Sequence, residues 1–296
     1  MSLSELTMLM LVVLVTAAFL RRPTLLFGIF GVSLLVASGV DLFTAVPVWG
    51  SVLIGLGCWA GLMGLAFGFL VLVCKAVDLE KEQEEDSRFY RIVMNIYIEA
   101  LISLVGVRLH TKGLEKTPKE GRFLLVCNHL FLADPGILLN CFRKSQLAFV
   151  TKKENQSMFV VGKIMHKILC QPIDRENDRS ALKTILKCIQ LIKEDKVSIG
   201  VFPEGYTSKD GKLHHFRSGV FKIAQKTGVP IVVCTIQNTR QIFKNLAKLK
   251  KTDVHMHLVD VIPAEALEGR TTVDIAEQVH AMMLADLGPE YAMEDA

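Results

Sequence analysis

The sequence lacks the features of several protein classes. Its 34 basic and 30 acidic residues leave a net charge of only +4, which gives no support for nucleic-acid binding. No Gly-x-Ser-x-Gly segment is present, which argues against a hydrolase built on a nucleophile elbow. The seven cysteines are odd in number and form no Cys-x-x-Cys pair, and no His, Cys and carboxylate cluster has metal-ligand spacing. We therefore expect free thiols in a reducing compartment and no metal site.

Apolar residues, in contrast, are abundant. They make up 51% of the 296 residues and are concentrated in three opening stretches, at residues 6–20, 24–40 and 51–74. The third stretch carries no charge and is long enough to cross a hydrocarbon core of about 30 Å, and its glycines suit close helix packing. The first two could span only with their flanks, and a re-entrant hairpin is the alternative. We predict a membrane anchor of two to three helices at 1–75 and a second domain at 76–296.

The basic residues that flank these stretches predict an orientation. Arg21, Arg22 and Lys75 should lie on the cytoplasmic side of the membrane. No basic residue precedes the first stretch, which argues against a cleaved signal peptide. The sequence therefore predicts an integral membrane protein whose large domain faces the cytoplasm.

After the apolar stretches, short strand-like runs alternate with helical patterns. Strands are predicted at 123–126, 147–150, 197–202, 231–236 and 255–261, and helices at 135–142, 158–169, 178–193, 220–227 and 272–287. An acidic segment at 78–86 resembles the first turns of a further helix that continues to about residue 105. This alternation predicts an α/β fold with a mostly parallel sheet flanked by helices.

A histidine and a carboxylate follow the first predicted strand. His129 can take a proton near neutral pH, and Asp134 can hold the second ring nitrogen if the chain turns between them. The pair would supply the base and the orienting acid of a catalytic triad, with a substrate hydroxyl as nucleophile. The alternative is structural, because Asp before Pro135 is also a good helix cap.

Four motifs occur in a fixed order along the chain. They are Asn-His-x-x-x-x-Asp at 128–134, Pro-Ile-Asp-Arg at 172–175, Phe-Pro-Glu-Gly at 202–205 and Val-Pro-Ile-Val at 229–232. Over roughly residues 85–290 the chain resembles the glycerolipid acyltransferases, specifically the 1-acylglycerol-3-phosphate O-acyltransferases. The resemblance implies direct transfer of a fatty acyl group to a glycerol hydroxyl, with no acyl-enzyme, no metal and no cofactor. The donor would be a thioester of coenzyme A or of acyl carrier protein.

The resemblance also implies roles for individual residues. His129 would be the general base and Asp134 its orienter, while Arg175 would bind the acceptor phosphate and Glu204 and Gly205 would shape the acceptor site. Arg217 stands where the family has a lysine in a Phe-Lys-x-Gly segment. For Arg175 a surface ion pair is the alternative, and for Glu204 a turn carboxylate. The substrate-binding residues carried over are Asn128, Arg175, Glu204, Gly205 and Arg217.

One departure concerns the acceptor. Many members continue Glu-Gly with Thr-Arg-Ser, whereas this chain has Tyr206-Thr207-Ser208, and Lys209, Lys212 or Arg217 would have to supply the missing cation. We predict a membrane-bound enzyme that converts lysophosphatidic acid to phosphatidic acid. The alternatives are another lysophospholipid or glycerol-3-phosphate as acceptor, and an inactive lipid-binding scaffold.

A cysteine beside the first motif and a cluster of lysines each have two interpretations. Cys127 touches the first motif and could be an acylated nucleophile, but strand alternation favours buried packing. A basic cluster of Lys244, Lys248, Lys250 and Lys251 suits either solvent or contact with anionic lipid, coenzyme A phosphates or an acidic carrier protein.

Overall fold

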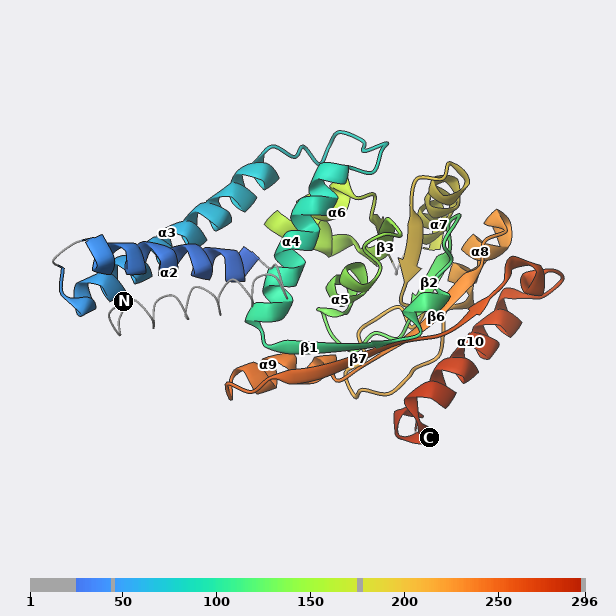
Figure 1. The fold of residues 1–296 in the computed structure, drawn as a ribbon. Coiled ribbons are helices and arrows are strands. Elements are labelled where there is room, and N and C mark those ends of the chain that lie inside the picture. Colours follow the sequence, from blue (N-terminus) through green and yellow to red (C-terminus); the bar gives the residue numbers. More distant parts are fainter. Residues whose placement is uncertain (1–24, 44–45, 175–177, 294–296) are drawn as a thin grey trace. The chain divides into compact units, whose positions relative to one another are not determined.

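The computed structural model describes residues 25–43, 46–174 and 178–293 (Figure 1). These residues form two compact units, one of residues 25–77 and 99–104 and the other of residues 78–98 and 105–293. The division falls inside α4 (Arg88–Leu104). The predicted domains at 1–75 and 76–296 stay a prediction.

The first unit contains two helices, α2 (Leu25–Phe43) and α3 (Val48–Lys75). They pack closely at Gly55, where a Cβ atom would lie 2.8 Å from the Cβ of Ala37. Gly57, Gly61, Gly64 and Gly68 have nothing within 4 Å of such an atom. Of the glycines predicted to allow close packing, only Gly55 therefore does so among the described residues.

In the described residues, α3 is the one helix that is long and apolar enough to cross a membrane. It has 28 residues and a peak mean hydropathy of 2.1, and the shorter apolar part of α2, Gly28–Asp41, does not reach that length. This finding is weak support for membrane association. The predicted stretch at 6–20 lies outside the described residues, so the number of spans and their orientation stay predictions.

The second unit is built on a seven-stranded sheet with the order β1-β7-β6-β2-β5-β3-β4. All neighbouring strands are parallel except β6 and β7, which are antiparallel. The strands are β1 (Val107–Lys112), β2 (Leu124–Cys127), β3 (Leu147–Lys152), β4 (Gln171–Ile173), β5 (Ser198–Val201), β6 (Ile231–Gln237) and β7 (Thr252–Ile262). The central strands β2 and β5 are buried along their whole length, because helices cover both faces of a parallel sheet.

Helices flank this sheet (Figure 1). They are α5 (Asp134–Cys141), α6 (Phe159–Lys167), α7 (Asp178–Lys193), α8 (Lys222–Thr227), α9 (Ile242–Leu246) and α10 (Thr272–Leu287). The predicted α/β class, with a mostly parallel sheet flanked by helices, is confirmed. Sequence patterns missed β1, β4 and α9.

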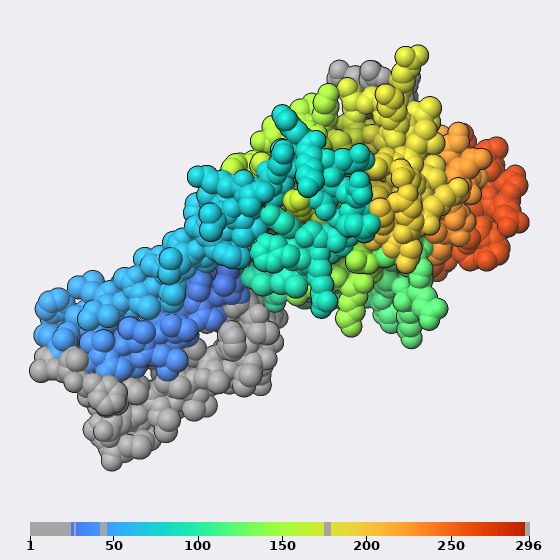
Figure 2. Space-filling view, turned by 90° about the horizontal axis from the view of Figure 1, so that it is seen from above, coloured from blue at the N-terminus to red at the C-terminus, as the bar shows by residue number. Residues whose placement is uncertain are grey.

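The acidic segment 78–86 is not helical, and the predicted helix begins only at Arg88. Asp86 forms a buried ion pair with Arg91 at 2.6 Å, and the guanidinium also donates to the carbonyl oxygen of Leu147 at 2.9 Å. Glu82 binds Lys187 at 2.8 Å, so the segment lies against α7, as the cyan chain beside the yellow helix shows in Figure 2. Partners elsewhere in the fold thus hold Asp86 and Glu82, and the segment forms an irregular connection in place of a helix.

Candidate active site

The candidate site lies where three neighbouring parallel strands end. Strands β6, β2 and β5 are adjacent, so their carboxyl ends meet at one edge of the sheet. His129 comes two residues after β2, and Glu204 three residues after β5. The fold therefore brings two motifs together that are 75 residues apart in sequence.

The His129 ring is held by Asp134. Its Nδ1 lies 2.9 Å from Oδ2 of Asp134, and the carboxylate is fully buried. No residue in the described chain hydrogen-bonds the second ring nitrogen, Nε2, and 13% of the His129 side chain is exposed. An oriented imidazole with one free nitrogen is the arrangement that a general base requires.

Asp134 does not cap the helix that it opens. Its Oδ2 accepts the backbone N–H groups of Leu130 and Phe131, each at 2.7 Å, in addition to the His129 ring. Helix α5 has no side-chain cap, and its N-cap position is Ala133. The capping alternative is therefore wrong, because the carboxylate points back to the turn that carries His129.

The backbone of His129 is fixed as tightly as its ring. Its N–H donates to Oε1 of Glu204 at 2.9 Å, and its carbonyl oxygen accepts the N–H of Ser208 at 2.8 Å. The ring stacks on Phe202 with centroids 4.1 Å apart, and Phe202 stacks on Phe149 at 5.3 Å. His129 is therefore positioned by its own loop and by the loop after β5.

Glu204 is a buried support for both loops. Its side chain is 1% exposed, and its other oxygen, Oε2, accepts the N–H of His214 at 3.1 Å. Burial raises the pKa of the Glu204 carboxyl, and the two backbone N–H groups oppose that shift. Glu204 thus joins the two loops through its bonds to the backbone, and its expected role in the acceptor site stays a prediction.

Gly205 and Arg217 lie together. Gly205 has a φ of +82°, and a Cβ there would lie 2.8 Å from Nε of Arg217, so only glycine fits without strain. The N–H of Arg217 donates to the carbonyl oxygen of Pro203 at 2.8 Å, and its side chain is exposed. Gly205 therefore lets an exposed cation lie against the Phe-Pro-Glu-Gly loop.

Asn128 has a structural role in place of the expected substrate contact. The residue is 1% exposed, its Nδ2 donates to the carbonyl oxygen of Ile236 at 3.0 Å, and its Oδ1 accepts the N–H of Ile236 at 2.8 Å. Both ends of the amide are thus occupied in tying β2 to β6. The physical reason is burial, because a residue that is 1% exposed with both amide ends bonded to Ile236 has little access to a substrate.

Cys127 is fully buried, and burial raises the pKa of its thiol well above the usual value. A thiol that resists ionisation is a poor nucleophile. The structure therefore favours the packing interpretation of Cys127 over an acylated cysteine.

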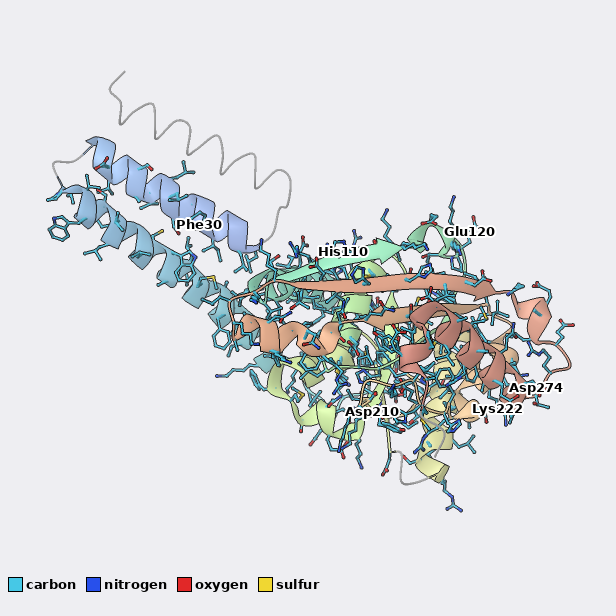
Figure 3. All side chains as sticks on the ribbon, turned by 90° about the horizontal axis from the view of Figure 1, so that it is seen from below. Phe30, His110, Glu120, Asp210, Lys222 and Asp274 are labelled. Atoms are coloured by element: carbon cyan, nitrogen blue, oxygen red, sulfur yellow. The ribbon has the colours of Figure 1, made fainter. Side chains whose placement is uncertain are left out.

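A cleft of about 480 Å³ lies at the loop that follows the Phe-Pro-Glu-Gly motif. Its lining residues are Tyr206, Thr207, Lys209, Asp210 and His214. Asp210, marked in Figure 3, lies 2.9 Å from Nε2 of His214, and Glu204 connects His214 to His129 through one carboxylate. Lys212 does not line the cleft, because its Nζ donates to the carbonyl oxygen of Glu290 at 2.8 Å.

Arg175 lies outside the described residues, so its expected contact with the acceptor stays a prediction. Strand β4, which runs parallel to β3, ends at Ile173, two residues earlier. Among the described residues no group of three or more His, Cys, Asp or Glu side chains could hold a metal ion.

Sequence reasoning missed Phe202 and Ser208 as supports of His129. In the sequence Phe202 is simply the first residue of the Phe-Pro-Glu-Gly motif, and Ser208 is the last residue of the Tyr-Thr-Ser segment that follows it. Both flank Glu204 in the sequence, and that closeness was the one signal that could have suggested them.

Comparison with known proteins identifies the family of the chain. Residues 108–237 match the family model described as Acyltransferase. The chain is 29% identical over 195 residues to a 1-acyl-sn-glycerol-3-phosphate acyltransferase of Borreliella burgdorferi, covering 62% of this chain and 74% of that protein. It is 31% identical over 153 residues to the Bacillus subtilis protein of that name, covering 50% and 72%. A chloroplastic relative from Brassica napus is 35% identical over 158 residues, which span 52% of this chain but only 45% of the relative.

A solved structure shares the fold. The crystal structure of the 1-acyl-sn-glycerophosphate (LPA) acyltransferase PlsC from Thermotoga maritima matches with a TM-score of 0.58 at 21% identity, covering 78% of this chain and 91% of that one. This likeness shows the fold, and the sequence matches show the family. The chain belongs to the 1-acylglycerol-3-phosphate O-acyltransferase family and is an O-acyltransferase.

Proposed function

We propose that this enzyme transfers a fatty acyl group from an acyl thioester to lysophosphatidic acid, giving phosphatidic acid for phospholipid synthesis. The observation that carries the proposal is the His129 ring, whose Nδ1 is bound by buried Asp134 while Nε2 has no hydrogen-bond partner among the described residues. The names of the relatives support this choice of acceptor, since they are 1-acyl-sn-glycerol-3-phosphate acyltransferases.

The proposed reaction is a single transfer. Nε2 of His129 takes the proton of the acceptor hydroxyl as its oxygen attacks the thioester carbonyl carbon. A carbon–oxygen bond forms, the carbon–sulfur bond breaks, and the thiolate leaves with the proton from the imidazolium. Asp134 stabilises the imidazolium through the 2.9 Å bond to Nδ1. Because the thioester is already activated, the chemistry needs no acyl-enzyme and no cofactor.

Three cations are candidates to hold the acceptor phosphate. Arg217 is exposed beside Gly205, Lys209 lines the cleft, and Arg175 follows β4 in the sequence. Guanidinium groups bind phosphate oxygens with two parallel hydrogen bonds, which suits Arg175 and Arg217 to this task. Lys212 is the weakest of the expected substitutes for the missing arginine, because a carbonyl oxygen occupies its ammonium group.

The proposal also covers the acyl donor and the location of the enzyme in the cell. The donor is a thioester of coenzyme A or of acyl carrier protein. The anchor keeps the enzyme in the membrane where its lipid acceptor lies, with the catalytic unit in the cytoplasm. The 28-residue apolar helix α3 and the seven free thiols of the sequence support this placement.

Another acceptor is the main alternative, because Thr207 stands where many relatives have an arginine. A panel of lysophosphatidic acid, other lysophospholipids and glycerol-3-phosphate, assayed with one acyl thioester and read by mass spectrometry, decides between them. We expect phosphatidic acid as the main product. A main product from another acceptor would refute the choice of substrate.

Two variants test the mechanism in the same assay. His129→Ala should lower turnover by about 10² to 10⁴ or more, since it removes the general base. His255→Ala is the matched control, because His255 is an exposed imidazole that stacks on His110 in another part of the sheet. Near-normal turnover by His129→Ala would exclude the proposed base.

A further inference from the structure

A surface around α9 combines exposed apolar and basic side chains. We call it the α9 surface and define it by Phe243, Lys244, Leu246, Lys248, Leu249, Lys250 and Lys251, all of which are exposed. Phe243, Leu246 and Leu249 are 51%, 36% and 94% exposed. Exposed apolar patches with polar or charged residues around them often mark a contact with a protein or a membrane.

The charge of this segment has one sign. Between Thr239 and Thr252 the sequence has five basic residues and no acidic one. Among the described residues, no ion pair is formed by Lys244, Lys248, Lys250 or Lys251. Four ammonium groups are therefore available to an anionic partner.

The backbone of the segment is held in place while its side chains are not. Ile242 is 2% exposed, Nδ2 of Asn245 donates to Oγ1 of Thr252 at 3.1 Å, and the N–H of Lys250 donates to the carbonyl oxygen of Asn245 at 2.8 Å. Leu249 has a φ of +54°, a conformation that favours glycine or asparagine over leucine. A bulky apolar residue in that position, almost fully exposed, is not explained by folding and indicates a contact outside the chain.

The α9 surface is continuous with the catalytic loop. The ring of Phe243 packs edge-on against Phe131, with centroids 5.1 Å apart at 83°. Phe131 is two residues from His129, its N–H is bound by Asp134, and the next residue, Leu132, is 69% exposed. Helix α9 also follows β6, whose carboxyl end lies at the same edge of the sheet as that of β2 (Figure 1).

We propose that the α9 surface docks on a membrane containing anionic lipids, so that the catalytic unit has a membrane contact of its own in addition to α3. Leucine and phenylalanine side chains enter the interface between headgroups and acyl chains, and lysines bind the lipid phosphates. Each lysine near an anionic surface strengthens binding roughly fivefold. The contact places the loop of His129 beside the lipid phase, and it does not depend on which lipid is the acceptor.

Trypsin reports directly on this contact, because it cleaves after lysine. The full-length protein is placed in nanodiscs of pure phosphatidylcholine or of phosphatidylcholine with phosphatidylglycerol, and cleavage after Lys248 and Lys250 is followed by mass spectrometry. We expect cleavage about tenfold slower in the anionic nanodiscs, and a return to the neutral rate in high salt, which screens the charges. Lys119, in the turn beside the labelled Glu120, serves as an internal control that should not change (Figure 3).

A variant separates docking from simple shielding. Leu246→Ser with Leu249→Ser keeps every lysine and should lose most of the protection. The matched control is Leu182→Ser with Leu186→Ser on α7, whose leucines are 51% and 55% exposed, and it should keep the protection. Circular dichroism confirms that each variant is folded.

Three results would overturn the proposal. The first is equal cleavage in neutral and anionic nanodiscs. The second is equal protection of Lys119, which would mean that the disc shields the whole protein. The third is protection in neutral nanodiscs only when acyl carrier protein is added, which would assign the α9 surface to an acidic protein. None of these results depends on turnover, so they are distinguishable from a failure of the proposed reaction.

Discussion

Glu204→Gln tests whether Glu204 positions His129 or touches the acceptor. The carboxylate accepts two backbone N–H groups, from His129 at 2.9 Å and from His214 at 3.1 Å. Glutamine keeps one acceptor oxygen but turns an N–H₂ group toward the other amide. One buried N–H therefore loses its partner, which costs about 1–3 kcal/mol. The change is small in volume, so the loops should stay folded but less well aligned.

The expected kinetic result follows from the position of His129. A misplacement of about 1 Å can cost about 10² in rate, so kcat should fall by about 10- to 100-fold. The Michaelis constant for the acceptor should change less than about threefold, since both carboxylate oxygens already bind backbone groups. Glu194→Gln is the matched control, because that carboxylate is exposed and pairs only with Gln190 and Lys196. A raised acceptor constant with an unchanged kcat would place Glu204 against the acceptor and refute the positioning role.

The same substitution changes the dependence of stability on pH. Burial raises the pKa of Glu204 above its usual value of 4.5, so the folded state holds this proton more tightly than the unfolded state. The stability that Glu204 contributes is then full below 4.5 and is lost as the pH rises through the raised pKa. Glutamine does not titrate in this range. The Tm of Glu204→Gln relative to wild type should therefore be higher at pH 8 than at pH 4, and an unchanged difference would contradict the raised pKa.

Four further predictions concern other parts of the chain. Asp134→Asn should lower kcat by at least about 10². The amide oxygen can still accept the N–H groups of Leu130 and Phe131, but it cannot stabilise an imidazolium as a charged carboxylate does. Near-normal turnover would contradict this role of Asp134. Cys127→Ala should retain substantial turnover, and an acyl-cysteine found by mass spectrometry would overturn direct transfer. Arg175→Ala should raise the Michaelis constant for the acceptor by about one to two powers of ten and leave the constant for the donor unchanged, because it removes charge-assisted hydrogen bonds to phosphate. Arg179→Ala, at an exposed position of α7, is the control. Deletion of residues 1–75 should make the protein extractable by alkaline carbonate, and resistance would reveal another span.

The central sheet was predictable because its strands are buried on both faces. Strand β2 appears in the sequence as a short apolar run and strand β5 as a similar run that contains Ser198 and Gly200, and the structure places each strand within one residue of the prediction. Strand β4 has three residues, too few for a pattern, and β1 lies at the edge of the sheet with mostly exposed side chains. Helix α7 has the predicted ends, yet Leu182 and Leu186 on its apolar stripe are exposed. Periodicity identifies a helix but does not say which side chains find a partner.

Hydrogen bonds at the site decide between roles that the sequence pattern leaves undecided. A polar residue after a strand has the same pattern whether it contacts a substrate or ties two strands, and Asn128 does the latter through Ile236, 108 residues away. Asp134 before a proline fits a cap equally well, and only the structure shows that it binds backwards to Leu130 and Phe131. The partner of Asn128 is remote in the sequence, whereas the partners of Asp134 are only three and four residues away, so the sequence pattern fails to show the direction in which each side chain bonds.

The candidate site separates the buried groups that hold His129 from the exposed cations that would bind the acceptor in the proposed reaction. His129 is held by Asp134 and Glu204, both buried, through bonds that involve its ring and its backbone. Lys209 and Arg217, in contrast, are exposed and have no fixed partner among the described side chains. Substitutions in the exposed group should therefore change the acceptor Michaelis constant, and substitutions in the buried group should change kcat. Thr207 lines the cleft and has no side-chain hydrogen bond to His129 among the described residues, so the residue type at position 207 should leave the geometry of His129 unchanged.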